Sequence, residues 1–434
     1  MPKTTKKICI ITLGCPKNVV DSEMLMKQFQ ANNLELVQSS DESDATIINT
    51  CGFIQSAKKE SLDTIMHAVE LKKTGRIQQL VVMGCLAERY AANLKKEIPE
   101  VDAYVGANKI DQVVSALGAH PKYNLIGERV LTTPPHYAYL KISEGCDRPC
   151  SFCSIPLMRG KHISKPIETI LHEARKLTEL GVRELIIIAQ ESTYYGIDLY
   201  GKRKLAELLE KLSSINGVEW IRLMYAFPTG FPSDVLKMIA DNPKICKYLD
   251  IPLQHISDPV LASMKRGTDS REARSLIDKI RNEVPGIALR TTLIVGYPNE
   301  GEKEFLELKH FVDEVKFERL GLFTYSQEED TTAFDLGDPV PEEVKQERFN
   351  AIMETQREIS LAHNNLLVGK KIRTLVDTLE EGTGIGRTQY DAPEIDNAVT
   401  LHGVENVKSG NFYDVLIDDC DAYDLFGRLV KEEL

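Results

Sequence analysis

A compact run of three cysteines carries the strongest chemical signal in the sequence. Cys146, Cys150 and Cys153 have the spacing C-x3-C-x2-C, and the Asp-Arg-Pro stretch between the first two makes the run a polar loop rather than part of a core. Thiolates are the ligands that hold iron–sulfur clusters. Three ligands on a four-iron cluster leave one iron open, as a catalytic metal site keeps an open position. The run therefore predicts a 4Fe–4S cluster that can bind a small molecule.

A zinc site is the alternative for the same loop. His162 follows the run closely enough to complete a Cys3His ligand set, which is a common set for structural zinc. The x3 spacing is unusual for such sites, and a second set of three cysteines also favours iron–sulfur chemistry. With zinc, or with four ligands per cluster, the chain would be a non-enzymatic RNA-binding or electron-transfer module.

The second set comprises Cys15, Cys51 and Cys85, which are far apart in sequence but alike in context. Each follows an apolar run that predicts a β-strand, and each has a glycine beside it. In an open parallel α/β sheet the carboxyl ends of the strands line one edge, where ligands bind. The three cysteines are therefore expected to converge and hold a second cluster with an open iron.

The other three cysteines have ordinary interpretations. Cys9 lies inside a predicted strand and is assigned to the core, and Cys246 and Cys420 have no cysteine neighbours in sequence. An odd total of nine in a large chain without a signal peptide is poor evidence for disulfides.

The strands and helices that must position Cys15, Cys51 and Cys85 lie in the first 120 or so residues. Apolar runs alternate there with amphipathic stretches, which predicts a parallel sheet flanked by helices. The runs are 8–13, 45–49, 80–83 and 103–105, and the clearest helical stretches are 21–30 and 57–73.

A second series of elements follows a linker at Thr132-Thr133-Pro134-Pro135. Six strand candidates alternate with helical stretches, which predicts a full or partial (β/α) barrel. The compact cysteine run follows the first of these strands, on the face where barrel loops form active sites. The strand candidates are 138–142, 184–189, 220–224, 248–251, 289–295 and 320–325.

The end of the chain changes character again. A long charged helix is predicted over 342–364, and the last 65 or so residues alternate turn signals with short β-rich runs, as in a small all-β barrel. The predicted domains are therefore 1–130, 136–365 and 367–434.

With its place after the first barrel strand, the compact cysteine run resembles that of the radical S-adenosylmethionine (SAM) superfamily. The resemblance implies that the open iron chelates the amino and carboxylate groups of SAM, which one electron then cleaves to a 5′-deoxyadenosyl radical. The candidate SAM contacts are Phe152, before the last cysteine of the run, and Gln190 and Arg290, on barrel strands or at their ends. The alternative is a structural role, in core packing for Phe152 and in the barrel interior for Gln190 and Arg290.

With both cysteine sets in place, the whole chain resembles the methylthiotransferase family. The resemblance implies an N-terminal cluster domain with an open α/β sheet, a central radical SAM barrel and a C-terminal TRAM barrel of OB-like type. It also implies two 4Fe–4S clusters and SAM as cofactors. One SAM would yield the radical that removes hydrogen from an unactivated carbon, and a sulfur species on the first cluster, methylated by a second SAM, would capture the carbon radical. The matching segments are 14–18, 21–23, 145–160, 250–257, 264–267 and 291–298.

Within the family, three segments resemble the branch that modifies an aspartate of small-subunit ribosomal protein S-twelve. They are Pro16-Lys17, where the tRNA-modifying branch would have Gln-Met, the cluster loop 143–156, and the terminal segment 386–396. Asn397 departs from this branch, which usually has glycine there. A tRNA adenosine methylthiotransferase is the alternative within the family.

Charge is a separate indication of the partner. The whole chain has a net charge of −12, and residues 368–434 contain seven Lys or Arg against fourteen Asp or Glu. RNA binding needs cationic surface to meet phosphates, so tRNA is the less favoured substrate. An acidic domain suits a basic ribosomal protein, although acidity also serves solubility.

The expected setting is the cytoplasm. No apolar run approaches the ~18 residues of a membrane span, and the apolar stretch near the start is too short for a signal peptide. The radical chemistry further implies a reductant such as flavodoxin or ferredoxin.

Overall fold

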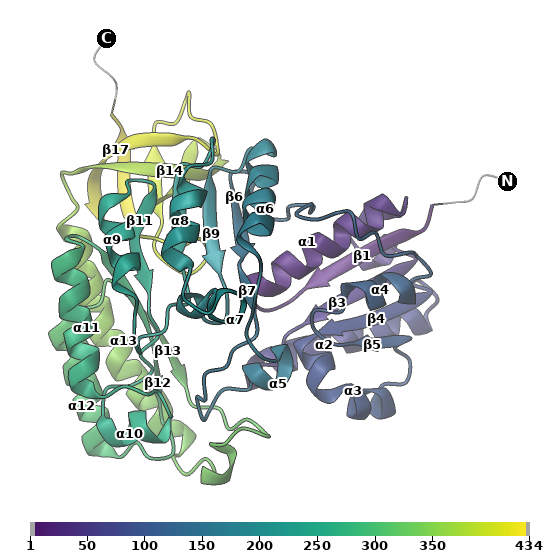
Figure 1. Cartoon of the computed structure of the whole chain (residues 1–434), viewed down its shortest axis with the longest axis horizontal. Helices are drawn as coiled ribbons and strands as arrows, with labels where there is room; N and C mark the ends of the chain where they lie inside the picture. Colours follow the sequence, from purple (N-terminus) through teal and green to yellow (C-terminus); the bar gives the residue numbers. More distant parts are fainter. Residues whose placement is uncertain (1–4, 431–434) are drawn as a thin grey trace.

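A computed structural model describes residues 5–430, and three groups of elements follow one another along the chain (Figure 1). The first runs from β1 (Lys7–Thr12) to α4 (Ile110–Ala116), the second from β6 (Tyr137–Lys141) to α13 (Glu342–Asn365), and the third from β14 (Lys371–Glu380) to β18 (Leu425–Leu429). The predicted fold class, an α/β sheet, a (β/α) barrel and a small all-β barrel, is confirmed.

The N-terminal sheet has five parallel strands in the order β2-β1-β3-β4-β5. The chain changes direction across the sheet between β1 and β3, and this switch point is where doubly wound sheets bind ligands. The new strands are β2 (Glu35–Val37), β3 (Ala45–Thr50), β4 (Gln79–Gly84) and β5 (Ala103–Val105), and the helices are α1 (Pro16–Ala31), α2 (Gln55–Lys73) and α3 (Cys85–Glu97) with α4.

Helices cover both faces of this sheet, because successive side chains on a strand point to opposite faces. Ile47 of β3 packs in one buried cluster with Leu25 and Phe29 of α1, whereas its neighbour Ile48 packs in another with Ile65 of α2. A central strand is buried on both faces and tends to be apolar. The β4 strand has the continuous apolar run 80–83, whereas β3 combines Ile47 and Ile48 with buried polar residues.

The central part is a half-open barrel. Its six parallel strands run in the order β6-β9-β10-β11-β12-β13. Because β6 and β13 are edge strands and do not pair with each other, the barrel is partial rather than full. The remaining strands are β9 (Glu184–Ile188), β10 (Trp220–Leu223), β11 (Ile245–Asp250), β12 (Ala288–Val295) and β13 (Arg319–Thr324). The main outer helices are α6 (Ile167–Glu179), α8 (Leu205–Ser213), α9 (Ser233–Asp241), α11 (Ser270–Glu283) and α12 (Glu302–Val315).

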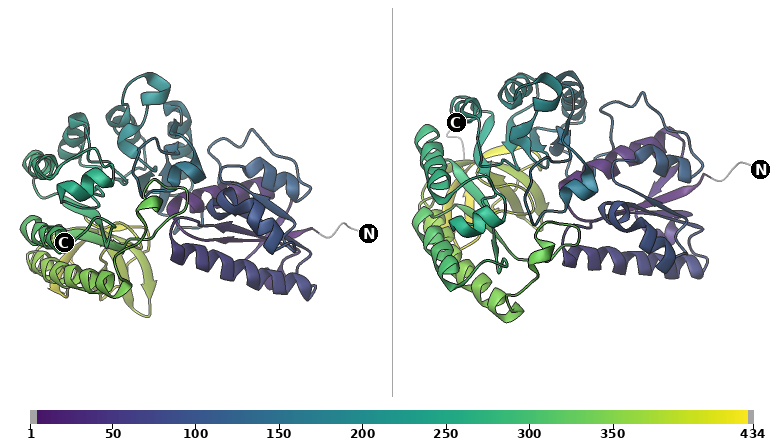
Figure 2. Two further views of the ribbon diagram at one scale, coloured as in Figure 1. Left: turned by 90° about the horizontal axis from the view of Figure 1, so that it is seen from below. Right: turned by 60° about the horizontal axis from the view of Figure 1, so that its bottom comes forward.

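The inner face of the half-open barrel is filled partly from outside it. Trp220 and Tyr248 on the strands share a buried cluster with Val20 of α1 and with Leu375 and Ala392 of the third part. Both views in Figure 2 show the N-terminal sheet beside the barrel, and Figure 1 shows the terminal strands at the end of the barrel that lies away from that sheet. The three parts therefore share one interior.

The third part is a closed five-stranded barrel in the order β14-β15-β16-β18-β17. Its core contains Val376, Val399, Leu401 and Val415. The strands not yet given are β15 (Thr383–Thr388), β16 (Val399–His402) and β17 (Phe412–Cys420).

Segment 388–397, which joins β15 to β16, reaches into the half-open barrel. Asp391 accepts hydrogen bonds from Arg319 at 2.5 and 2.9 Å. Asp396 lies 3.3 Å from Arg290 Nε and accepts a 2.7 Å hydrogen bond from the Tyr248 hydroxyl. Two of the acidic residues in the terminal charge count are therefore internal counter-ions.

None of the helices between residues 5 and 430 combines the length and the apolar character that a membrane crossing requires.

Candidate active site

Cys15, Cys51 and Cys85, called the first triad below, lie at the carboxyl ends of three adjacent strands. Cys15 caps α1 just after β1, Cys51 directly follows β3, and Cys85 is the first residue of α3, directly after β4. The sheet order places β1, β3 and β4 side by side at the switch point. The predicted position of each cysteine at a strand end is thus where the structure places it.

Two glycines allow these strand ends to approach one another. A Cβ added to Gly14 would lie 3.1 Å from the Cys51 sulfur and 2.7 Å from its Cβ. Gly84 has a φ of +100°, which favours glycine, and a Cβ there would meet Asn49 Oδ1 and the Thr50 carbonyl oxygen at 2.6 Å. Gly84 therefore permits the tight turn that puts Cys85 at the start of its helix.

The thiols of the first triad influence one another. Burial raises the pKa of Cys85 to about 11; the Arg159 guanidinium opposes this, and the Cys15 and Cys51 sulfurs add to it. Burial also raises the pKa of Cys51, again with a contribution from Cys15. Without metal, the Cys51 and Cys85 thiols hold their protons at neutral pH, and metal binding would have to release them.

Cys146, Cys150 and Cys153, called the second triad below, line one common cavity. Burial raises the pKa of Cys146 to about 11 and that of Cys153 to about 12. Arg266 Nη1 donates a 3.1 Å hydrogen bond to the Cys150 sulfur.

The cavity also receives a residue from the N-terminal sheet. Phe53, two positions after Cys51, lines it together with the second triad. Nearby, the Lys17 ammonium of α1 lies 3.0 Å from the centroid of the Tyr225 ring, and Tyr225 is part of the cavity wall. Burial lowers the pKa of Lys17 to about 8, although the neighbouring Cys15 and Asp250 oppose this. The wall of the cavity therefore includes the second triad and one residue close in sequence to the first triad.

The residues expected to contact SAM have different surroundings. Phe152 and Gln190 line the cavity, and the Gln190 Oε1 atom is buried without a hydrogen-bond partner among the described residues. Arg290 is not part of the lining, because Asp250 at 3.0 Å and Asp396 at 3.3 Å hold its guanidinium. The geometry brings the first two to the second triad and gives Arg290 an ion-pairing role.

The alternative zinc ligand also has other contacts. His162 Nε2 lies 3.1 Å from Ser164 Oγ, and its ring packs edge-on against Tyr194. Within residues 5–430, no three His, Cys, Asp or Glu side chains are grouped tightly enough to hold a single metal ion. The donor set of each triad is three thiols, the ligand type that holds iron–sulfur clusters.

Two residues of the cavity wall have a strained backbone that the sequence does not reveal. Tyr225 and Gln254 follow the β10 and β11 strands with φ of +60° and +76°, a region that costs non-glycine residues free energy. The Gln254 Oε1 atom is buried and lacks a hydrogen-bond partner within residues 5–430. Strain of this kind gathers at functional sites.

Three family models match the chain in sequence order. Residues 7–106 match the family described as uncharacterized protein family UPF0004, residues 140–312 match the radical SAM superfamily, and residues 368–430 match the TRAM domain.

Solved structures with the same fold are distant in sequence. A radical S-adenosylmethionine methyltransferase, TsrM, from Kitasatospora setae, solved with cobalamin and a [4Fe-4S] cluster, has a TM-score of 0.56 at 11% identity and covers 94% of this chain and 84% of its own. The cobalamin-dependent S-adenosylmethionine radical enzyme OxsB has a TM-score of 0.51 at 14% identity, over 81% and 56% of the two chains. These similarities concern the fold alone.

Curated relatives are far closer and span the whole chain. A protein of Chloroherpeton thalassium is 52% identical over 99% of this chain and 100% of its own, and one of Christiangramia forsetii is 54% identical over 98% and 95%. Both are named ribosomal protein uS12 methylthiotransferase RimO. With radical SAM and TRAM domains in the same order, the chain belongs to the RimO family of radical SAM methylthiotransferases.

Proposed function

We propose that this chain attaches a methylthio group to the β-carbon of an aspartate in ribosomal protein uS12, the protein called S-twelve above. The observation that carries the proposal is the full-length identity of about one half with relatives named for that activity. The cavity supports it, because Phe53, in the loop that follows Cys51, and the second triad line the same space.

Membership of the radical SAM superfamily implies SAM and one 4Fe–4S cluster. We propose that the second triad holds this cluster and that the first triad holds another. Three thiols at adjacent strand ends, with glycines that let them approach, support the additional cluster. When bound, these groups supply a radical for a C–H bond that no general base could deprotonate.

The residues of the chain itself orient and shield this chemistry. We propose that Phe152 and Gln190 contact SAM, because both line the cavity. Glu144 accepts a 2.5 Å hydrogen bond from Gln190 Nε2, which leaves the Gln190 carbonyl oxygen free for a ligand. Arg148 forms a two-pronged ion pair with Glu191 at 2.6 and 2.8 Å and fixes another part of the wall.

The charge of the terminal barrel supports a basic protein substrate. Asp391 and Asp396 are neutralised inside the molecule, but many other carboxylates of this barrel are on its surface. The exposed ones include Glu380, Glu381, Glu405, Asp414, Asp418, Asp419 and Asp421. This surface would repel RNA phosphates and attract a basic ribosomal protein.

Three further parts of the proposal concern setting and organisation. The reductant is flavodoxin or ferredoxin, and the reaction takes place in the cytoplasm, where a ribosomal protein would be met. The domains are 1–130, 136–365 and 367–434, a division supported by the breaks between α4 and β6 and between α13 and β14.

The decisive experiment is anaerobic reconstitution followed by incubation with SAM, a reductant and either uS12 or tRNA. We expect about eight irons per chain, as two 4Fe–4S clusters require, and the mass of one added methylthio group on uS12. Modification of tRNA alone would establish the alternative substrate. About four irons would remove the additional cluster.

Cysteine variants separate the roles of the two triads. Cys146→Ala is expected to abolish SAM cleavage, and Cys51→Ala to abolish methylthio transfer while SAM cleavage continues. Cys9→Ala is the matched control, because Cys9 is buried in β1 and outside both triads. Iron loss from the control as large as that from Cys51→Ala would contradict the assignment.

A further inference from the structure

Arg159 connects the two triads. It is the last residue of α5 (Ile155–Arg159), the short helix that follows the second triad. Its side chain is 4% exposed and crosses to the N-terminal sheet, where its Nε donates a 3.2 Å hydrogen bond to the Cys85 sulfur. A residue next to the second triad in sequence thus contacts a sulfur of the first.

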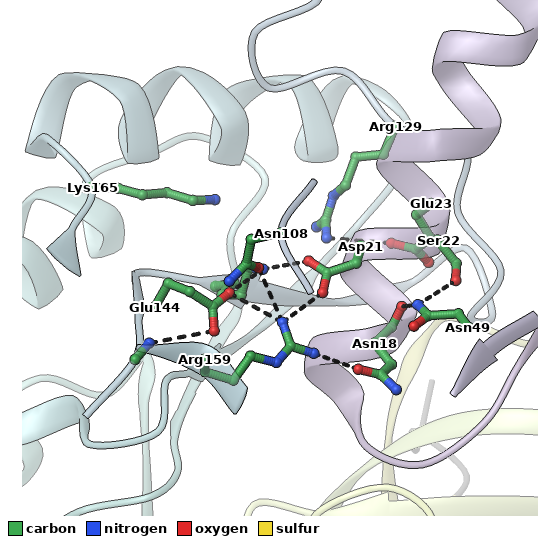
Figure 3. Close-up of polar contacts among 12 residues, drawn as sticks. Asn18, Asp21, Ser22, Glu23, Asn49, Asn108, Arg129, Glu144, Arg159 and Lys165 are labelled. Carbon is green, nitrogen blue, oxygen red and sulfur yellow. Dashed lines mark hydrogen bonds and ion pairs between the residues drawn. The ribbon is translucent and has the colours of Figure 1, made fainter. Parts of the chain in front are cut away.

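Three more residues of the N-terminal part fix the plane of the Arg159 guanidinium (Figure 3). Its Nη1 donates to Asp21 at 2.8 Å and to Asn108 at 3.1 Å, and its Nη2 donates to Asn18 at 2.5 Å. A planar guanidinium held at several donors has little freedom to rotate. The direction of the N–H bond toward Cys85 is therefore set by the fold.

The same network extends to the cavity wall. Glu144, two residues before Cys146, lies 3.3 Å from Arg159 Nη1 and accepts the hydrogen bond from Gln190. Lys141 forms ion pairs with both Asp21 and Glu144. With two cations and two carboxylates the buried network is balanced in charge, so the contact with Cys85 adds a hydrogen-bond donor to the sulfur without an unpaired cation.

We propose that Arg159 is a positioning residue for the iron–sulfur group of the first triad, whose reduction potential its N–H···S hydrogen bond raises. Hydrogen bonds to cluster sulfurs and the local charge are among the factors that set such potentials. A donor on the sulfur stabilises the more negative, reduced state, and this effect is strong in a buried site. The inference rests on the additional cluster proposed above.

The second triad contains a similar contact. Arg266 Nη1 donates to the Cys150 sulfur at 3.1 Å, as Arg159 does to Cys85 at 3.2 Å. Each triad thus has one cysteine with an arginine donor, and the two arginines belong to separate networks. The potentials of the two groups can therefore be set independently.

The test uses the full chain with Cys146, Cys150 and Cys153 replaced by Ala, so that only the first triad can hold iron. Arg159→Gln and Arg159→Lys are introduced in this background. Arg129→Gln is the matched control, because Arg129 is also buried at the same interface, 3.3 Å from Glu23 and 3.5 Å from Glu173, and does not contact a cysteine. Iron content, the midpoint potential by redox titration with electron paramagnetic resonance, and the unfolding temperature are measured for each protein.

We expect Arg159→Gln to lower the midpoint potential and Arg159→Lys, which keeps the charge, to lower it less, while Arg129→Gln leaves it unchanged. Iron loss from the Arg159 variants alone, at a similar unfolding temperature to Arg129→Gln, would also support the positioning role. An unchanged potential in Arg159→Gln, or equal iron loss in all three variants, would overturn the inference. If the parent background holds no iron, the additional cluster itself is absent, which contradicts the proposed function as well.

Discussion

At the scale of single residues, burial separates the cysteines by reactivity. Cys246 is 1% exposed on β11, and burial raises its pKa to about 12, although the nearby Arg222 opposes this. Cys15 and Cys150 are partly exposed and lie at strand ends or on the cavity wall. Reactivity of a thiol requires both its thiolate form and access to reagent, so Cys246 is a structural residue.

Alkylation tests the expected difference in reactivity between the buried Cys246 and the partly exposed Cys15 and Cys150. In the metal-free protein at pH 8, Cys246 is expected to stay unmodified by iodoacetamide, whereas Cys15 and Cys150 react, as read by peptide mass spectrometry. The raised pKa contributes stability below about pH 8.5 that is lost as the pH rises toward 12, because the unfolded thiol ionises first. Rapid labelling of Cys246 in the folded protein would contradict its burial.

Backbone strain at Gln254 gives a second prediction at this scale. Its left-handed φ of +76° costs a non-glycine residue on the order of 1 kcal/mol. The free energy of unfolding of Gln254→Gly is therefore expected to be about 1 kcal/mol higher than that of Gln254→Ala. Denaturant titration measures this difference. Both variants are expected to bind SAM more weakly, because each removes the unpartnered carbonyl oxygen. Equal stability of the two variants would show that the strain is absent.

At the scale of elements, the strand-to-helix turns deliver the cysteines. In the first triad the turn at Gly84 is the most crowded, since Asn49 and Thr50 from β3 lie against it. Gly118, after α4, also has a positive φ of +75°, but no atom lies within 4 Å of an added Cβ. Gly84 has φ +100° and ψ −158°, a region that is essentially restricted to glycine, so it differs from Gly118 in backbone conformation as well as in crowding. Gly118 serves as the uncrowded reference.

Gly84→Ala is expected to cost about 2–5 kcal/mol, from the left-handed backbone and the overpacking together. Gly118→Ala is expected to cost about 1–2 kcal/mol from the backbone alone. Chemical denaturation measures both values. Only Gly84→Ala is expected to lose the iron of the first triad. Retention of full iron by Gly84→Ala would mean that Cys85 does not depend on this turn.

The elements could be predicted better than the contacts between them. Buried parallel strands such as β3 and β4 contain short apolar runs, and their order along the chain places Cys51 and Cys85 at one edge. The three-residue strand β2 has no such run and was missed. The contact between Arg159 and Cys85 joins residues 74 apart, and no local pattern encodes it.

At the scale of the whole molecule, buried ion pairs fasten the terminal barrel to the half-open barrel. Glu184 of β9 lies 2.8 Å from both Arg222 of β10 and Arg387 of β15. Burial alone would raise the pKa of Glu184, but Arg387 and Arg222 lower it below its ordinary value. Asp377 behaves in the same way, because His136 and Arg387 outweigh its burial.

Acid is therefore expected to release the terminal barrel. Carboxylates with lowered pKa values contribute stability above about pH 4.3 that is lost as the pH falls through their folded values. Hydrogen–deuterium exchange is expected to show loss of protection in segment 388–397 below about pH 4, before the N-terminal sheet unfolds. In the Glu184→Gln variant, segment 388–397 is expected to be less protected from exchange than in the unchanged protein even at pH 7. Protection that persists unchanged to pH 3 would contradict the role of these ion pairs.

Because segment 388–397 contributes to the barrel interior, the order of synthesis determines when that interior can be completed. A ribosome releases the chain from its N-terminus, so all six barrel strands emerge before Asp391 and Asp396 exist to meet Arg319 and Arg290. Until then Trp220 and Tyr248 on the inner face lack the cover of Leu375 and Ala392 and pack only against earlier parts of the chain, such as Val20 of α1. The nascent chain thus passes through a stage in which all six cysteines of the two triads have been synthesised but the inner face of the barrel is still partly exposed.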